Sequence, residues 1–296
     1  MKRTLKDWIL ATRPWSFPAS IISILVSASY LFMKTQGVNF SYINVILSLF
    51  MMMLFQAASN LIGDYFDYKH KIDLPDSLNG VRHISSGKFS PKMVLCYGFV
   101  LLFFAMVLGL IILINSNFSY IWIGILGALM VCFYPFLKYN ALGDVDVLLG
   151  YAIMPSIGMS YVMSGRLFLD IIWLSLSFGL LTVAILHANN TRDIKNDTRA
   201  KITTFAILIG EKTAKKIYYI ELIIPYILII IYIIFDFPIY IIITLCTIPM
   251  AISNIKLMHK LHNDETIIAD LDKRTASLQL TFGLLLSLSL ILAAIL

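Results

Sequence analysis

Long stretches without a charged residue or histidine constrain this chain more than any other feature. They cover residues 14–33, 35–63, 93–137, 147–165, 171–186, 222–235, 237–255 and 275–296. A helix needs ~20 mostly apolar residues to cross a bilayer. The stretches are continuously apolar rather than alternating, and they are too long for the strands of a membrane barrel. The sequence therefore predicts an all-α membrane protein.

The composition supports this prediction. Hydrophobic residues make up 59% of the 296 residues and charged residues 14%, whereas a soluble domain averages ~45–50% apolar and ~25% charged residues. A soluble fold, a disordered chain and a nucleic-acid-binding domain are excluded, and we expect one membrane-embedded domain over residues 1–296. Cys96, Cys132 and Cys246 lie in apolar runs without metal-binding spacing, so we expect small buried hydrophobic residues there.

A polar break at residues 115–119 divides the longest stretch in two. The nine predicted spans are 17–33, 42–63, 93–114, 119–137, 145–163, 168–188, 216–235, 238–254 and 276–296. With this division, every Lys and Arg except Lys34 and Arg166 falls on the side of the N-terminus. The positive-inside rule therefore predicts a cytoplasmic N-terminus and an external C-terminus, and we expect a bacterial inner membrane.

Two rows of acidic residues end the second and sixth predicted spans. The first row contains Asn60, Asp64 and Asp67, and the second contains Asn189, Asp193 and Asp197. Residues three or four positions apart share one face of a helix. Each row therefore presents an amide and two carboxylates together, at the same predicted depth near the cytoplasmic surface.

This pattern predicts a metal site. Carboxylates that crowd at a partly dry site repel one another unless a cation joins them, and oxygen ligands suit Mg²⁺, which proteins usually bind together with substrate phosphates. Basic residues that could cover phosphate oxygens lie close to the rows in sequence, at Lys69, Lys71, Arg82, Arg192 and Lys201. Carboxylates for a metal and bases for phosphate indicate a diphosphate substrate, and the surrounding helices indicate that its other end is a lipid.

Four segments, residues 11–19, 60–73, 137–144 and 189–204, carry a family resemblance. In these segments the chain resembles the UbiA superfamily of intramembrane aromatic prenyltransferases, and within it the 1,4-dihydroxy-2-naphthoate branch of menaquinone synthesis. The nine spans agree with that family's all-helical fold. The chain departs from common family patterns at Tyr68, Asp144 and Ala200, which leaves prenyl transfer as the implied reaction and the aromatic acceptor open.

The resemblance implies Mg²⁺-dependent transfer of a polyprenyl group from polyprenyl diphosphate to an aromatic acceptor. Two Mg²⁺ ions would be held by Asp64 with Asp67 and by Asp193 with Asp197. Asn60 and Asn189 would bind metal or orient the carboxylates, and the candidates for phosphate oxygens are Arg82, Arg192 and Lys201. Either Lys138 or Arg13 would hold an acceptor carboxylate, and the candidate rings for an allylic cation are Tyr65, Tyr134 and Tyr139.

Other interpretations remain open. A secondary transporter also combines apolar helices with carboxylates, although its sites tend to lie near the membrane midplane. Within the superfamily, the acceptor could be 4-hydroxybenzoate, homogentisate, haem or a lipid. Asp144 and Asp146 either position the acceptor or cap a helix. We expect the five histidines to be polar interface residues and Glu221 to extend from its span to the membrane interface.

Overall fold

The structure is a computed structural model that describes residues 3–38, 40–72, 84–261 and 265–296. Within these ranges it has nine helical segments long and apolar enough to cross a membrane, as predicted. They are Pro18–Thr35, Tyr42–Lys69, Pro91–Asn115, Phe118–Tyr139, Gly143–Ser164, Asp170–Arg192, Glu211–Ile234, Ile239–His259 and Thr266–Ile295. The described residues contain no β-strand, so the prediction of an all-α polytopic protein is confirmed.

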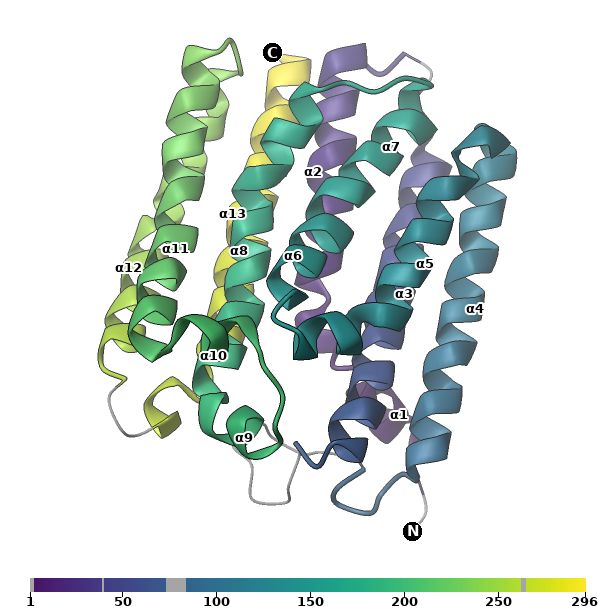
Figure 1. The fold of residues 1–296 in the computed structure, drawn as a ribbon. Helices are drawn as coiled ribbons and strands as arrows, with labels where there is room; N and C mark the ends of the chain where they lie inside the picture. Colours follow the sequence, from purple (N-terminus) through teal and green to yellow (C-terminus); the bar gives the residue numbers. More distant parts are fainter. Residues whose placement is uncertain (1–2, 39, 73–83, 262–264) are drawn as a thin grey trace.

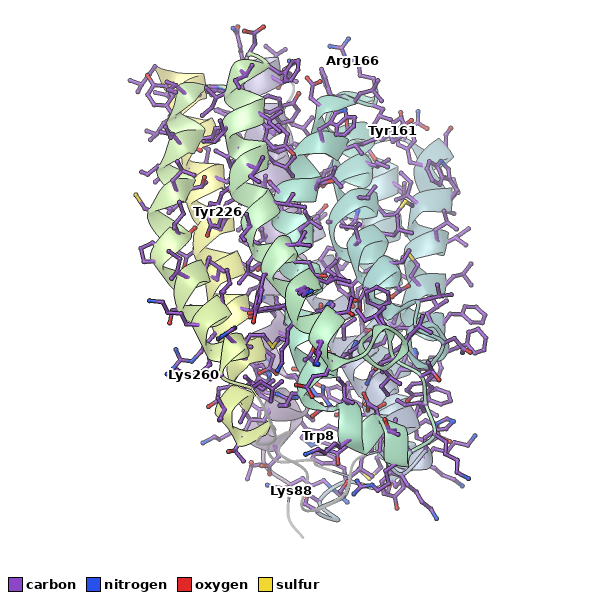
Figure 2. All side chains as sticks on the ribbon, turned by 60° about the vertical axis from the view of Figure 1, so that its left-hand side comes forward. Trp8, Lys88, Tyr161, Arg166, Tyr226 and Lys260 are labelled. Carbon is purple, nitrogen blue, oxygen red and sulfur yellow. The ribbon has the colours of Figure 1, made fainter. Side chains whose placement is uncertain are left out.

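The spanning helices run side by side in one bundle (Figure 1). The N-terminus and the C-terminus lie at opposite ends, as an odd number of spans requires. Two short helices, α1 (Leu5–Ala11) and α9 (Ile194–Arg199), lie at the N-terminal end of the bundle. Lys88 and Lys260 also lie at this end, whereas Arg166 lies at the other (Figure 2), in agreement with the predicted separation of basic residues.

The helix ends that carry the acidic rows differ from the expected boundaries. Helix α3 (Tyr42–Lys69) continues past the predicted end at residue 63, so the whole first row lies on its last turns. Helix α8 (Asp170–Arg192) ends at its C-cap residue Asp193, and α9 begins at the next residue. The second row is therefore divided between two helices rather than carried by one helical face.

One of the spans is not a single regular helix but three short helical segments joined end to end. The fifth span consists of α6 (Gly143–Leu148), a π-helical stretch (Leu149–Ile153) and α7 (Met154–Ser164). Pro155 lies in the first turn of α7. Because proline lacks a backbone N–H and crowds the preceding turn, the widened π-helical stretch just before it has a local cause.

The prediction of buried cysteines is wrong, because all three thiols lie on exposed positions of spanning helices. The outer face of these helices is apolar in composition, with exposed Phe, Leu and Ile side chains. A small apolar thiol suits a face that meets lipid as well as it suits a protein interior. The interior is tightest where α13 (Leu271–Ile295) packs on α2 (Pro18–Thr35): a Cβ at Gly283 would clash with Ile22.

Candidate active site

A polar cavity lies among α3, α5 (Ile121–Tyr139), α8 and α9, and its empty volume, including open space at its mouth, is about 460 Å³. Both acidic rows line it, although they are far apart in the sequence. Its lining residues are Arg13, Ser59, Asn60, Gly63, Asp64, Asp67, Ile72, Tyr134, Lys138, Asn189, Asp193 and Asp197. The structure thus brings together the six residues of the two rows with Arg13, Lys138 and Tyr134 from the predicted set.

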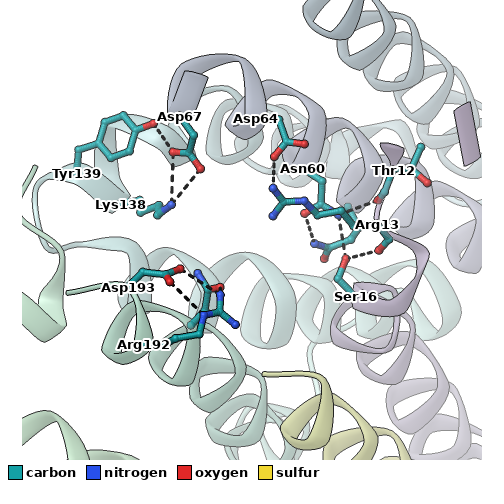
Figure 3. A network of polar contacts seen from close by, with 12 residues as sticks. Thr12, Arg13, Ser16, Asn60, Asp64, Asp67, Lys138, Tyr139, Arg192 and Asp193 are labelled. Atoms are coloured by element: carbon teal, nitrogen blue, oxygen red, sulfur yellow. Dashed lines mark hydrogen bonds and ion pairs between the residues drawn. The ribbon is translucent and has the colours of Figure 1, made fainter. Parts of the chain in front are cut away.

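Asp64 forms an ion pair with Arg13 (Figure 3). Arg13 lies between α1 and a short 3₁₀ turn, in the left-handed backbone region with φ 54°. Asn60, one turn before Asp64, fixes this segment through its amide nitrogen, which donates to the Thr12 carbonyl and to Ser16 Oγ, both at 2.9 Å. The Asn60 side chain therefore positions the segment that carries Arg13.

Asp67 is held by two neighbouring residues at the end of α5. Lys138 Nζ lies 3.3 Å from Asp67 Oδ2, and the Tyr139 hydroxyl donates to Asp67 Oδ1 at 2.7 Å (Figure 3). The Lys138 and Asp67 side chains are 11% and 9% exposed. Burial strengthens the attraction between the two charges, and removal of either one would be costly because it would leave the other buried and unpaired.

Arg192 forms contacts that differ from the expected role in phosphate binding. Its guanidinium donates to both carboxylate oxygens of Asp193 at 3.1 Å and to the Asn189 side chain. It also donates to the Ala269 carbonyl and lies 3.4 Å from Asp272 at the start of α13. Arg192 is buried and does not line the polar cavity. It links the second acidic row to α13.

The other predicted residues have separate places. Lys201 is exposed and does not line the polar cavity, and Arg82 lies outside the described residues. Tyr65 packs edge-on against Phe66 and is also absent from the cavity lining. The backbone amide of Thr203, just after Lys201, donates to the Tyr139 carbonyl at 3.1 Å. This contact joins the segment after α9 to the end of α5.

An apolar groove meets the polar cavity at Ser59, which lines both. The groove lies between α3, α4 (Pro91–Asn115), α5 and α7, and its empty volume, including open space at its mouth, is about 1270 Å³. Asp146 is its one charged lining residue among the described residues, and it is buried. Sequence reasoning missed Ser59, since a serine in an apolar span carries no motif.

The expectations for His187 and Glu221 are wrong. Both lie inside the bundle rather than at the membrane interface, with 1% and 6% exposure. His187 Nδ1 lies 3.1 Å from Glu221 Oε1, so each polar side chain is buried against the other. Asp144, in the first turn of α6, lies beside them and forms no helix cap. The pairing of helices that causes this burial is not visible in the sequence.

The geometry defines a class of protein: a polytopic membrane enzyme in which a carboxylate-lined cavity opens into an apolar groove. The comparisons with known proteins specify the class further. The model of the UbiA prenyltransferase family matches residues 10–294, and the chain belongs to this family. It is therefore a membrane-embedded prenyltransferase, and the transporter interpretation is not supported.

Relatives and solved structures agree with this assignment. The chain is 30% identical to the UbiA prenyltransferase domain-containing protein 1 homolog of Drosophila melanogaster, over 95% of this chain and 78% of that protein. It is 30% identical to the 1,4-dihydroxy-2-naphthoate octaprenyltransferase of Haemophilus influenzae, over 70% of each chain. A UbiA homolog from Archaeoglobus fulgidus bound to GPP and Mg²⁺ has the same fold, with TM-score 0.65, 15% identity and coverage of 94% and 98%.

Proposed function

We propose that this enzyme transfers a polyprenyl group from its diphosphate to 1,4-dihydroxy-2-naphthoate, the reaction of menaquinone biosynthesis. The observation that carries the proposal is the junction at Ser59 of a carboxylate-lined cavity and an apolar groove. A prenyl diphosphate has one end suited to each. The name of the Haemophilus influenzae relative supports the naphthoate acceptor, and the Archaeoglobus fulgidus homolog was solved with a prenyl diphosphate and Mg²⁺.

The donor atoms of the cavity suit Mg²⁺. The four carboxylates of Asp64, Asp67, Asp193 and Asp197 line it, and no thiol or imidazole among the described residues does. Hard oxygen donors of this kind favour Mg²⁺ over softer divalent ions. These four residues would hold the metal, which when bound neutralises the diphosphate as it leaves. Arg13 and Lys138 line the same cavity. When substrate and metal bind, each would leave its ion pair with a protein carboxylate and pair with a substrate anion instead.

Lys138 is the residue that we assign to the acceptor carboxylate. It extends from the end of α5, in a segment that is separate from both acidic rows in the sequence, and its largely buried side chain pairs with Asp67 of the first row. An aromatic carboxylate that leaves water requires a cationic partner. The bond between the prenyl carbon and the diphosphate oxygen breaks, and a new bond forms to the ring carbon that bears the carboxylate. That carboxylate then leaves as CO₂ and returns its bonding electrons to the ring.

The other end of the substrate fits the apolar groove. The groove is lined mainly by apolar side chains of α3, α4, α5 and α7, and Tyr151, Asp146 and Ser59 also line it. Tyr134, which lines the polar cavity, is the ring that we assign to the developing allylic cation. By the positive-inside rule the polar cavity, at the N-terminal end of the bundle, faces the cytoplasm.

The experiment uses purified enzyme, a labelled polyprenyl diphosphate and a panel of acceptors. We expect prenylated product and CO₂ from carboxyl-labelled 1,4-dihydroxy-2-naphthoate, with no product after Mg²⁺ is chelated. Product from 4-hydroxybenzoate, homogentisate, haem or a lipid in place of the naphthoate would contradict the acceptor assignment. Asp64→Asn and Asp193→Asn should each lower turnover by about 100-fold or more, because metal stabilisation is worth several kcal/mol. Near-normal turnover by either variant would reject the proposed metal site.

A further inference from the structure

Three ionisable side chains from three helices meet outside the polar cavity. They are Asp144 of α6, His187 of α8 and Glu221 of α11 (Glu211–Ile234). His187 Nδ1 lies 3.1 Å from Glu221 Oε1 and 3.3 Å from Asp144 Oδ2. The side chains are 0% exposed for His187, 8% for Glu221 and 12% for Asp144. None of the three lines the polar cavity or the apolar groove.

Hydrogen bonds within this cluster leave most of its polar atoms without a partner. A single Nδ1–H can point at only one of the two carboxylates that face it. Among the described residues, both oxygens of Asp144, Oε2 of Glu221 and Nε2 of His187 accept or donate no hydrogen bond. A buried polar atom without a partner costs about 1–3 kcal/mol, and more when it is charged. A cation bound by all three side chains would satisfy atoms that the single imidazole leaves without a hydrogen bond.

We propose that Asp144, His187 and Glu221 bind a divalent transition-metal ion such as Zn²⁺. One ligand atom from each residue lies within 4.8 Å of the other two. Donors around a tetrahedral ion with bonds of ~2.1 Å stand ~3.4 Å apart, so the two measured separations already have the required size. Imidazole nitrogen and carboxylate oxygen both bind Zn²⁺, and three protein ligands leave its fourth position for water, whereas Mg²⁺ favours oxygen ligands alone.

This metal site is separate from the carboxylate rows in both ligands and position. The rows supply oxygen donors to the polar cavity, whereas this cluster supplies a nitrogen and lies between α6, α8 and α11. His187 precedes Asn189 by two residues on α8, and Asp144 follows Lys138 by one short turn. A bound ion would fix the end of α8 against α6 and α11, and so hold one wall of the polar cavity in place.

The test measures metal content in the full-length purified protein. Zn²⁺ could also bind to the carboxylate rows, so the background carries Asp64→Asn and Asp193→Asn. After treatment with chelator, incubation with Zn²⁺ alone and desalting, we expect about one Zn²⁺ per chain in this background by elemental analysis. His187→Gln or Glu221→Gln added to the background should lower the retained Zn²⁺ at least tenfold. His259→Gln, at an exposed histidine, is the matched control and should leave it unchanged.

Two further readouts keep the proposal open to refutation if the cluster variants fold poorly. In the background protein, X-ray absorption at the zinc edge should show a nitrogen ligand at ~2.0–2.1 Å. The midpoint of thermal unfolding should rise with Zn²⁺ and not with Mg²⁺, because an ion that binds only the folded state stabilises it. Absence of bound Zn²⁺ in the background, or full retention in both cluster variants, would overturn the proposal.

Discussion

Asn60 offers the sharpest test of how the polar cavity is built. The resemblance implies that its amide oxygen binds metal or orients carboxylates, whereas in the structure its amide nitrogen donates to the Thr12 carbonyl and Ser16 Oγ. The amide oxygen accepts a weaker hydrogen bond from Gln56 at 3.3 Å. Asn60→Ala removes these contacts and should release the segment that carries Arg13 from the wall of the cavity.

The size of the effect follows from these contacts. Two hydrogen bonds at a net ~1 kcal/mol each contribute about 2 kcal/mol. The left-handed conformation of Arg13 opposes them with about 1–2 kcal/mol. Without the clamp formed by the hydrogen bonds from Asn60, the ion pair with Asp64 and the backbone hydrogen bonds between Arg13 and its neighbours Leu10 and Ser16 still oppose release of this conformation. Asn60→Ala should therefore lower kcat/KM by up to about 30-fold, since 1.4 kcal/mol corresponds to about tenfold.

The assay is prenyl transfer by purified variants across a Mg²⁺ titration. Asn60→Asp keeps an oxygen that a metal could use and removes the N–H donors. We expect it to be as impaired as Asn60→Ala, with both variants half-saturated at the Mg²⁺ concentration of the wild type. Gln56→Leu leaves both donor bonds intact and should change kcat/KM less than threefold, by our estimate of about 0.6 kcal/mol or less for a weak bond. A raised Mg²⁺ requirement in Asn60→Ala that Asn60→Asp restores would refute the clamp.

Three other predictions concern separate parts of the molecule. Lys138→Met should raise the KM for the aromatic acceptor and leave the KM for the prenyl diphosphate nearly unchanged. Lys138 lies beside Asp67 in the structure, and a raised KM for the diphosphate alone would show that it binds the diphosphate instead. A Cβ at Gly127 would meet no atom within 4 Å, and Gly127 lines the apolar groove, so Gly127→Leu should narrow the groove and reduce turnover of long prenyl diphosphates more than short ones, with Gly127→Ala nearly neutral. The Lys88 ammonium and then the Thr4 amide lower the pKa of the Asp7 carboxyl, so this contact stabilises the fold fully above the unfolded pKa of about 4, and the stabilisation is lost progressively as the pH falls from there through the lowered pKa of the folded state. Asp7→Asn should therefore lower the unfolding temperature at pH 7, and the difference from the wild type should vanish in acid; a constant difference across pH would argue against the ion pair.

The spans could be predicted because a bilayer imposes a length and an apolar composition on every helix that crosses it. Helix ends were less predictable. Helix α3 continues through Asp64 and Asp67, because the polar cavity within the protein accommodates charges that an apolar run excludes. Helix α11 begins at Glu211, before the predicted residue 216, since a helix can carry charged residues where it leaves the membrane.

The candidate site was also only partly predictable from the sequence. Spacing alone placed Asn60, Asp64 and Asp67 on one helical face, because helix periodicity is a local property. The partner of each carboxylate depends on which helices pack together. Nothing in the sequence pairs Arg13 with Asp64 or His187 with Glu221, since these contacts join residues far apart along the chain. Arg192 combines both cases. The sequence shows that it stands next to Asp193, but it does not show that its side chain is buried against the start of α13.

The ion pairs of the polar cavity explain how one set of residues can serve both the vacant and the substrate-bound enzyme under the proposed function. A carboxylate row within a membrane protein is costly unless cations stand beside it. Arg13 beside Asp64 and Lys138 beside Asp67 provide that compensation. Substrates that arrive with their own anions and with metal cations allow an exchange, in which the protein carboxylates turn to the metal and each basic residue turns to a substrate anion, which for Lys138 is the acceptor carboxylate. Loss of either basic residue should thus weaken substrate binding and destabilise the unliganded fold together, whereas a residue that only binds substrate would affect the first alone.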